Sequence, residues 1–257
     1  TGGIDFSIGP VMFASALISG YCLTQYHAPL WLCLIISLIV GSLFGLLNGY
    51  FVAYRFLPSF VTSLASIEIA KGIGSVFTKT QSVTWPTAGS ENSWYKNLVR
   101  AGNVPTGLIL LIIAAVICGI VLNKTKAGRY MLCIGSNKEA VRLSGVNTKK
   151  WEMIAYVICG LLAGCAAIFY VGAYTTVQPG LGDNFNNDAI AACVMGGTSM
   201  AGGVASILGT VIGTMIMSLM QEGILAMGFT ISYQYVISGI IVLIAVTADT
   251  LSRKRKV

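Results

Sequence analysis

The sequence predicts an all-α polytopic membrane protein, a bundle of transmembrane helices, on the strength of three observations. Only 10% of its 257 residues are charged, 55% are hydrophobic, and the mean hydropathy is +0.79. A soluble domain carries about 25% charged residues, which solvate its surface. The apolar residues also form continuous runs instead of the alternating pattern of a transmembrane β-strand. Most of the chain is therefore expected to lie in a bilayer.

Seven apolar runs are long enough to cross a bilayer, which takes about 20 residues of helix. An eighth run, Ala189–Gly203, is shorter and rich in glycine and alanine. The seven are residues 7–24, 30–54, 57–77, 106–123, 153–174, 204–221 and 232–248.

The Lys and Arg residues gather at Arg55, in the loop 124–151 and in the tail 252–257. Loops rich in Lys and Arg stay on the cytoplasmic side of a membrane. We therefore expect these three places and the C-terminus inside, and the polar loop at 78–104 outside. This distribution explains the net charge of +7 without nucleic acid as a partner.

The number of membrane crossings between two cytoplasmic points must be even, and this decides whether Ala189–Gly203 crosses. Lys150 and Arg253 flank three clear runs and this doubtful one, and both are expected inside, so the doubtful run must cross as well. Its weakly apolar backbone can do so only where protein shields it from lipid. We expect a short or broken element that lines a pathway, with Gly197 in a space sized for a hydrogen atom.

Ionisable residues within apolar runs are functional hypotheses by default. Glu68 and Lys71 are three residues apart and are expected to pair on one helix. Asp188 is expected at the start of an outer helix. Asp5 and Glu222 remain as candidates for contact with a transport pathway.

Glycines recur at a spacing of four, which allows helices to pack backbone to backbone. This pattern predicts a tightly packed multi-helix bundle. The pairs are Gly41 and Gly45, Gly45 and Gly49, Gly160 and Gly164, and Gly209 and Gly213.

The loop 124–151 is too polar to cross the membrane, and it contains the punctuation of a short helix. Asn137 is placed to cap KEAVRLSG at its start, and Gly145 is placed to end it after about two turns.

Several enzymatic and metal-binding classes lack their residues in this sequence. Neither the seven cysteines nor the single His27 has the spacing of a metal site, so the cysteines are read as packing residues. The chain has no G-x-x-x-x-G-K-[ST] loop for ATP. We therefore expect a protein that is not an enzyme and binds no cofactor itself.

Four stretches, in order along the whole chain, resemble one known family. They are GGIDFSIG; LFGLLNGYFVAY with LPSFVTSLA; AGRYMLCIGSNKEAVRLSGVN; and DAIAACVMGGTSMAGG followed by GTVIG, the most specific match. The family is that of permease subunits of bacterial ABC importers for ribose and related monosaccharides. One departure is Asn186-Asn187, where the family has a Glu and a Leu.

The resemblance implies a multi-pass protein of the bacterial plasma (inner) membrane, with 1–257 as one permease domain. Family members carry about two more membrane segments before GGID, so we expect this chain to be a partial version. The implied partners are a cytoplasmic ABC ATPase holding ATP and Mg, an extracytoplasmic sugar-binding protein, a second permease subunit that forms a homodimer, and membrane lipid. The residues implied to couple to the ATPase are Gly135, Ser136, Asn137, Glu139, Ala140, Arg142, Leu143 and Gly145.

Because sugars are neutral, their pathway needs hydroxyl, amide and aromatic groups. The candidate pathway residues are Asp5, Asn48, Ser59, Phe60, Thr62, Ser63, Gly196, Gly197, Thr198 and Ser199. The expected function is ATP-driven import of a monosaccharide, ribose or a related sugar. Two alternatives stay open: a proton- or ion-coupled secondary transporter of a small polar solute, with Asp5 or Glu222 titrating, and a membrane scaffold without transport.

Overall fold

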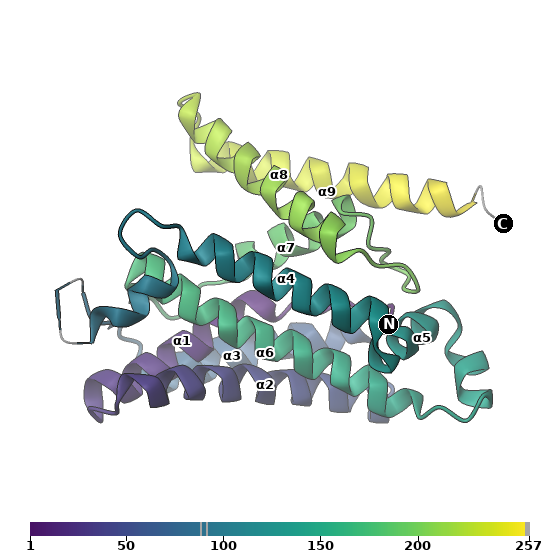
Figure 1. Ribbon diagram of the computed structural model, residues 1–257, viewed down its shortest axis with the longest axis horizontal. Helices are drawn as coiled ribbons and strands as arrows, with labels where there is room; N and C mark the ends of the chain where they lie inside the picture. Colours follow the sequence, from purple (N-terminus) through teal and green to yellow (C-terminus); the bar gives the residue numbers. More distant parts are fainter. Residues whose placement is uncertain (88, 91, 255–257) are drawn as a thin grey trace. The chain divides into compact units, whose positions relative to one another are not determined.

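The computed structural model describes residues 1–87, 89–90 and 92–254 and is almost wholly helical (Figure 1). Of the predicted basic tail 252–257, residues 255–257 lie outside the described residues. The described elements are α1 (Ile8–Gln25), α2 (Leu30–Arg55), α3 (Ser59–Phe77), β1 (Val83–Thr84), the 3-10 helix η1 (Ser93–Leu98), α4 (Thr106–Lys124), α5 (Lys126–Leu143), α6 (Thr148–Tyr174), β2 (Thr176–Val177), α7 (Asp183–Met195), α8 (Ile207–Ala226) and α9 (Ile231–Lys254).

The chain forms two compact units, each described here by itself. The N-terminal unit holds residues 5–114 and 149–183, and the C-terminal unit holds residues 1–4, 115–148 and 184 onward. The chain passes between the units after Ile4, within α4, and next to the first residues of α6 and α7.

In the N-terminal unit, α1 is the inner helix and packs against α2 and α3. Most of α1 is buried, with Phe13 and Leu17 in a cluster that includes Val171 of α6. By contrast, α2 and α3 present exposed large apolar side chains, among them Leu43 and Ile73. An apolar outer surface on a helical bundle is the arrangement that fits lipid as the surrounding solvent.

Glycines hold α2 directly against α6. A Cβ built on Gly41 or on Gly160 would come closer than 3.0 Å to the backbone of the other helix, a distance that real Cβ atoms do not adopt. One turn further along α2, Gly45 lies equally close to Tyr156, and Gly49 approaches Met153. The close helix approach predicted from the four-residue spacing is confirmed.

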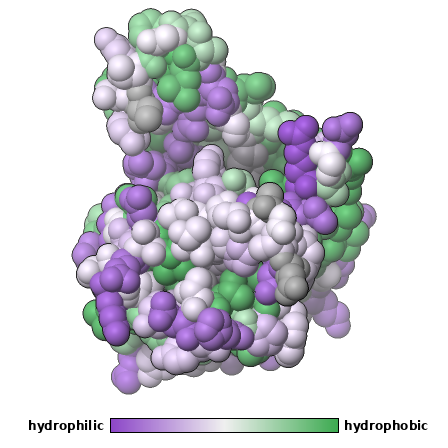
Figure 2. Space-filling model, turned by 90° about the vertical axis from the view of Figure 1, so that its left-hand side faces the viewer, coloured by the Kyte–Doolittle hydropathy of each residue, from purple (hydrophilic) through white to green (hydrophobic). Residues whose placement is uncertain are grey.

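The loop between α3 and α4 folds over one end of the N-terminal unit. Its strand β1 pairs antiparallel with β2, so that Val83 faces Val177. Trp85 and Tyr95 are buried beneath the loop, where Trp85 Nε1 donates to the carbonyl of Ala16 at 3.3 Å. Burial raises the pKa of Tyr95 to about 12, so this phenol stays protonated as a donor. Figure 2 looks onto this end, where hydrophilic and intermediate colours outweigh the green of apolar residues.

The C-terminal unit is built from α5, α7, α8 and α9. Gly196, just after α7, lies against the backbone of Gly209 in the first turn of α8. One turn along α8, Gly213 lies as close to the carbonyl of Ala192. Ser206 caps α8 by accepting a hydrogen bond from the Gly209 amide at 3.0 Å.

The predicted apolar runs largely match the helices. Within the part of the chain that the structure describes, six helices (α1, α2, α3, α4, α6 and α8) are long and apolar enough to cross a membrane, and α9 contains a shorter apolar stretch, Ser232–Ile244. The doubtful eighth run corresponds to α7, which has 13 residues. At about 1.5 Å per residue that helix is shorter than the roughly 30 Å hydrocarbon core, so a crossing there would need the following loop as well.

Residues 126–136 form a helix that the sequence analysis did not anticipate, and the Thr125 hydroxyl caps it by accepting from the Gly128 amide at 3.3 Å. Two expectations were wrong. Lys71 pairs with Asp183, at 2.6 Å, and not with Glu68 on its own helix. Asp183, rather than Asp188, begins the helix in that region.

We predict that Gly41→Ala lowers the thermal stability of the purified protein in detergent. The added methyl group meets the backbone of α6, which cannot rotate away, and overpacking of this kind costs about 1–3 kcal/mol. Gly72→Ala is the matched control, because Gly72 is also helical but a Cβ there meets nothing within 4 Å. Equal unfolding temperatures for the two variants would contradict the packing described here.

Candidate functional site

A buried polar network joins three segments of the N-terminal unit. The Asp5 carboxylate accepts hydrogen bonds from the Ser7 amide at 2.8 Å and from the Ser7 hydroxyl at 2.6 Å. Asn48 Nδ2 donates to Asp5 Oδ2 at 3.1 Å and to Ser7 Oγ at 2.9 Å. The Asn48 carbonyl oxygen in turn accepts from the Ser66 hydroxyl. Asn48 is 1% exposed, so α2 carries a fully satisfied amide at the centre of the bundle.

Helix α3 turns its hydroxyl side chains inward. Thr62, Ser63 and Ser66 are all buried, while Val61 and Leu64 on the same helix are exposed. Thr62 Oγ1 donates to the Pro58 carbonyl at 3.2 Å and Ser63 Oγ to the Phe60 carbonyl at 3.1 Å, so both are satisfied within their own turn.

The first turn of α3 carries the aromatic candidate. Phe60 is 53% exposed and meets Phe6 edge to face, with ring centroids 5.5 Å apart. Ser59 begins this helix and is partly buried, close to the hydroxyl of the buried Tyr156 on α6.

The structure brings together residues that sequence reasoning missed. Ser7 and Ser66 complete the network around Asn48, and the buried Glu152 and Tyr156 lie one helical turn apart on α6. Ser66 could have been found from the sequence, since it continues the helical face of Thr62 and Ser63. Glu152 lies one residue before the apolar run 153–174 and was not singled out from the sequence.

Four candidate pathway residues lie in the loop between α7 and α8, in the C-terminal unit. Thr198 donates its amide to the Cys193 carbonyl at 3.0 Å, and the Ser199 amide donates to Val204 at 2.9 Å. The expectation for Gly197 was wrong: a Cβ there meets nothing within 4 Å, and the residue is constrained by a φ of +85° instead. Its neighbour Gly196 is the one in close contact, against Gly209.

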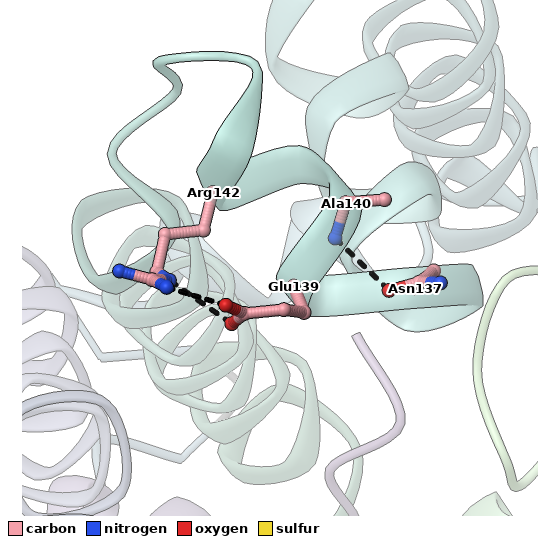
Figure 3. Close-up of polar contacts among 4 residues, drawn as sticks. All are labelled: Asn137, Glu139, Ala140 and Arg142. Carbon is pink, nitrogen blue, oxygen red and sulfur yellow. Dashed lines mark hydrogen bonds and ion pairs between the residues drawn. The ribbon is translucent and has the colours of Figure 1, made fainter.

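The candidate coupling residues divide at a break in α5. Asn137 has non-helical angles (φ −157°, ψ 93°), and its side-chain oxygen accepts from the Ala140 amide at 3.0 Å (Figure 3). Asn137 is thus the N-cap that the sequence predicted. The helix beyond it ends before Gly145, whose φ of +85° is a left-handed conformation that favours glycine.

The short helix 138–143 carries an exposed ion pair. Arg142 Nε donates to Glu139 Oε2 at 2.9 Å, and a second guanidinium nitrogen contacts the other carboxylate oxygen (Figure 3). This hydrogen bonding to Arg142 lowers the pKa of Glu139, so the pair stays ionised throughout the neutral range. Leu143 is 76% exposed beside it. The surface therefore combines a fixed bidentate pair with an unpartnered apolar side chain.

The predicted pathway residues are divided between the two units. Of the six candidates in the N-terminal unit, Asp5 and Asn48 bond to each other, and the other four line the start of α3. Gly196, Gly197, Thr198 and Ser199 belong to the C-terminal unit. The hydrogen bonds of Asp5 also give its carboxylate a structural role.

We predict that Asn48→Ala lowers the free energy of unfolding by about 1–3 kcal/mol, the cost of leaving buried hydrogen-bonding groups unsatisfied. Chemical denaturation monitored by circular dichroism measures the loss. Ser42→Ala is the control, because Ser42 lies on the same helix and bonds only to the Leu38 carbonyl one turn before it. If Asn48→Ala unfolds at the denaturant concentration of Ser42→Ala, the network adds no stability.

Comparison with known proteins places this arrangement in a family. A family described as "Branched-chain amino acid transport system / permease component" matches residues 1–246. The chain is 32% identical to the ribose import permease protein RbsC of Escherichia coli K12 over 253 residues, which cover 97% of this chain and 78% of that protein.

Two further relatives are named for sugars other than ribose. The chain is 31% identical to the fructose import permease protein FrcC of Rhizobium meliloti (99% of this chain, 72% of that protein). It is 29% identical to the xylose transport system permease protein XylH of Escherichia coli K12 (98% and 79%). No solved structure matches the chain. The chain belongs to the branched-chain amino acid transport permease family of bacterial ABC transporters, as a multi-pass transport subunit and not an enzyme.

Proposed function

We propose that this chain is the membrane subunit of an ATP-driven importer for a monosaccharide, ribose or a related pentose or hexose. Its named relatives import ribose, fructose and xylose. The three relatives are named for different sugars but are similarly identical to this chain. The comparison therefore supports a monosaccharide substrate without selecting one sugar. An extracytoplasmic binding protein would select the sugar, and a cytoplasmic ABC ATPase would supply ATP hydrolysis.

The observation that carries the proposal is the exposed helix 138–143, which we call the docking helix. Its start is fixed by the Asn137 cap, its end by Gly145, and its outer face by the pair of Glu139 and Arg142. A short helix with fixed ends and a fixed charge pair offers a preorganised surface, which reduces the entropic cost of docking a partner. We propose that the ATPase binds here.

The buried network supports a neutral solute. Its groups are an amide and hydroxyls on α2 and α3, and its one carboxylate, Asp5, is engaged by three hydrogen bonds. Amides and hydroxyls are the partners that sugar hydroxyl groups require. These three bonds engage the carboxylate in contacts within the protein. This favours the sugar importer over a secondary transporter driven through Asp5.

Orientation rests on the distribution of basic residues in the N-terminal unit. Arg55 ends α2, and Lys149 at the start of α6 lies over the rings of Tyr54 and Phe56, 5.8 Å and 4.8 Å from their centroids. The basic ends of α2 and α6 therefore share one end of the unit. Lys and Arg with interfacial aromatics are typical of the cytoplasmic boundary, so we propose this end and the C-terminus as cytoplasmic and the β1–β2 loop as external.

Lipid and a second permease subunit are the remaining proposed partners. α4 has no buried residue in the described structure, and its side chains are apolar all round. Such a helix needs an apolar environment outside the chain, and both acyl chains and a second copy of this subunit provide one.

Gly145→Asp is predicted to abolish co-purification of the ATPase and uptake of labelled ribose in the full-length transporter. The new residue would strain a φ of +85° and place a second negative charge two residues beyond Leu143, at the docking surface. Membrane insertion, followed by immunoblot of membranes, should be normal.

Gly228→Asp is the matched control. Gly228 has a φ of +81° and nothing within 4 Å of a Cβ, so the substitution adds the same strain and charge at the connection between α8 and α9. A Gly145→Asp protein that retains its ATPase and still imports ribose would refute the docking assignment.

A further inference from the structure

The first half of α5 touches the α7–α8 loop backbone to backbone, just before the docking helix begins. A Cβ on Gly135 would lie 3.0 Å from Gly202 Cα and closer still to the amide nitrogen of Gly203. From the other side, a Cβ on Gly202 would lie 2.8 Å from Gly135 Cα. No side chain separates the Gly135 backbone from the Gly202 backbone. If one of the two segments moves toward the other, the other must therefore move too.

The loop is itself stiff. Three of its glycines, Gly197, Gly202 and Gly203, hold a positive φ. Hydrogen bonds from the Ser199 amide to Val204 and from the Gly202 amide to Ser199, at 2.9 Å and 3.1 Å, close it on itself. A stiff loop in direct backbone contact transmits displacement instead of absorbing it.

The loop also holds the N-terminal residues of the chain. A Cβ on Gly202 would lie 2.7 Å from Gly2 N, and one on Gly2 would lie 3.0 Å from the carbonyl oxygen of Ala201. Three residues after Gly2 the chain reaches Asp5, the carboxylate that binds Asn48. The covalent chain therefore leads from this loop to the buried polar network.

We propose that Gly135 and Gly202 form the joint that couples the docking helix to the transport pathway. The inference rests on the proposed function. Asn137 breaks α5 two residues after Gly135, so the docking helix is joined through Ser136 and Asn137 to the segment that contacts the loop. The loop passes its displacement to Gly2 and, through Ile4, to Asp5. Gly135 and Gly202 are positioning residues: they touch neither sugar nor nucleotide, and they act by allowing direct backbone contact.

The test measures coupling separately from assembly. Gly135→Ala is introduced into the full transporter with its ATPase, reconstituted in liposomes with the ribose-loaded binding protein. The ATPase should co-purify as in the unmodified transporter, because Gly135 lies before the break at Asn137 and outside the docking helix. The number of ribose molecules imported per ATP hydrolysed should fall about tenfold, within the range of typical coupling energies between two sites.

Gly223→Ala is the matched control for Gly135→Ala, because Gly223 is helical and a Cβ there meets nothing within 4 Å. The number of ribose molecules imported per ATP hydrolysed should be unchanged in this variant. Gly202→Ala should reproduce the loss, whereas Gly228→Ala, which adds similar backbone strain in open space, should not. Should Gly135→Ala fail to assemble, Gly202→Ala decides the question, since it lies outside α5.

An unchanged ribose-to-ATP ratio in Gly202→Ala would overturn the proposal, as would loss of the ATPase from an otherwise folded Gly202→Ala transporter. Failure of the proposed function looks different: the unmodified chain would not bind an ATPase, or Gly145→Asp would leave it bound.

Discussion

Direct backbone contact between helices, allowed by glycine, is the constraint on which both units depend. Lipid is as apolar as leucine, so burial from water cannot drive one membrane helix onto another, and close van der Waals packing takes its place. Gly41 and Gly160 provide that packing between α2 and α6, and Gly196 and Gly209 provide it between the end of α7 and α8. A Cβ at any of these four positions would meet the backbone of the partner segment, so alanine there would push the two segments apart.

The same low-dielectric surroundings explain the polar interior. A buried polar group without a partner is costly, and in a membrane water cannot supply the partner. Asn48 satisfies Asp5, Ser7 and Ser66 at once, while Thr62 and Ser63 bond to carbonyls of their own helix. The result is an interior rich in hydroxyl and amide groups, surrounded by an apolar exterior. A sugar permease needs both properties in one bundle.

Periodicity and punctuation in the sequence predicted the helices, the glycine contacts and the ends of the docking helix, because each depends on local rules. The Asn137 side chain caps the helix by accepting from the Ala140 amide, three residues ahead. Gly145 ends it because its positive φ is a conformation that glycine adopts readily. What the sequence could not predict were pairings between distant segments. Lys71 has a nearby acid in Glu68 but pairs with Asp183, which is distant in sequence. Gly197 lies in open space, while its neighbour Gly196 contacts Gly209 of α8. Both outcomes depend on tertiary packing at the two ends of α7, which local sequence rules do not specify.

The most direct test of the central claim is sugar uptake by the reconstituted transporter. The full-length chain is placed in liposomes with the ATPase that co-purifies with it, and the ribose-loaded binding protein is supplied on the opposite face of the membrane. We predict accumulation of labelled ribose that requires ATP on the ATPase side and is unaffected by dissipating the proton gradient. Uptake that proceeds without the ATPase and is driven by a pH gradient would contradict the account.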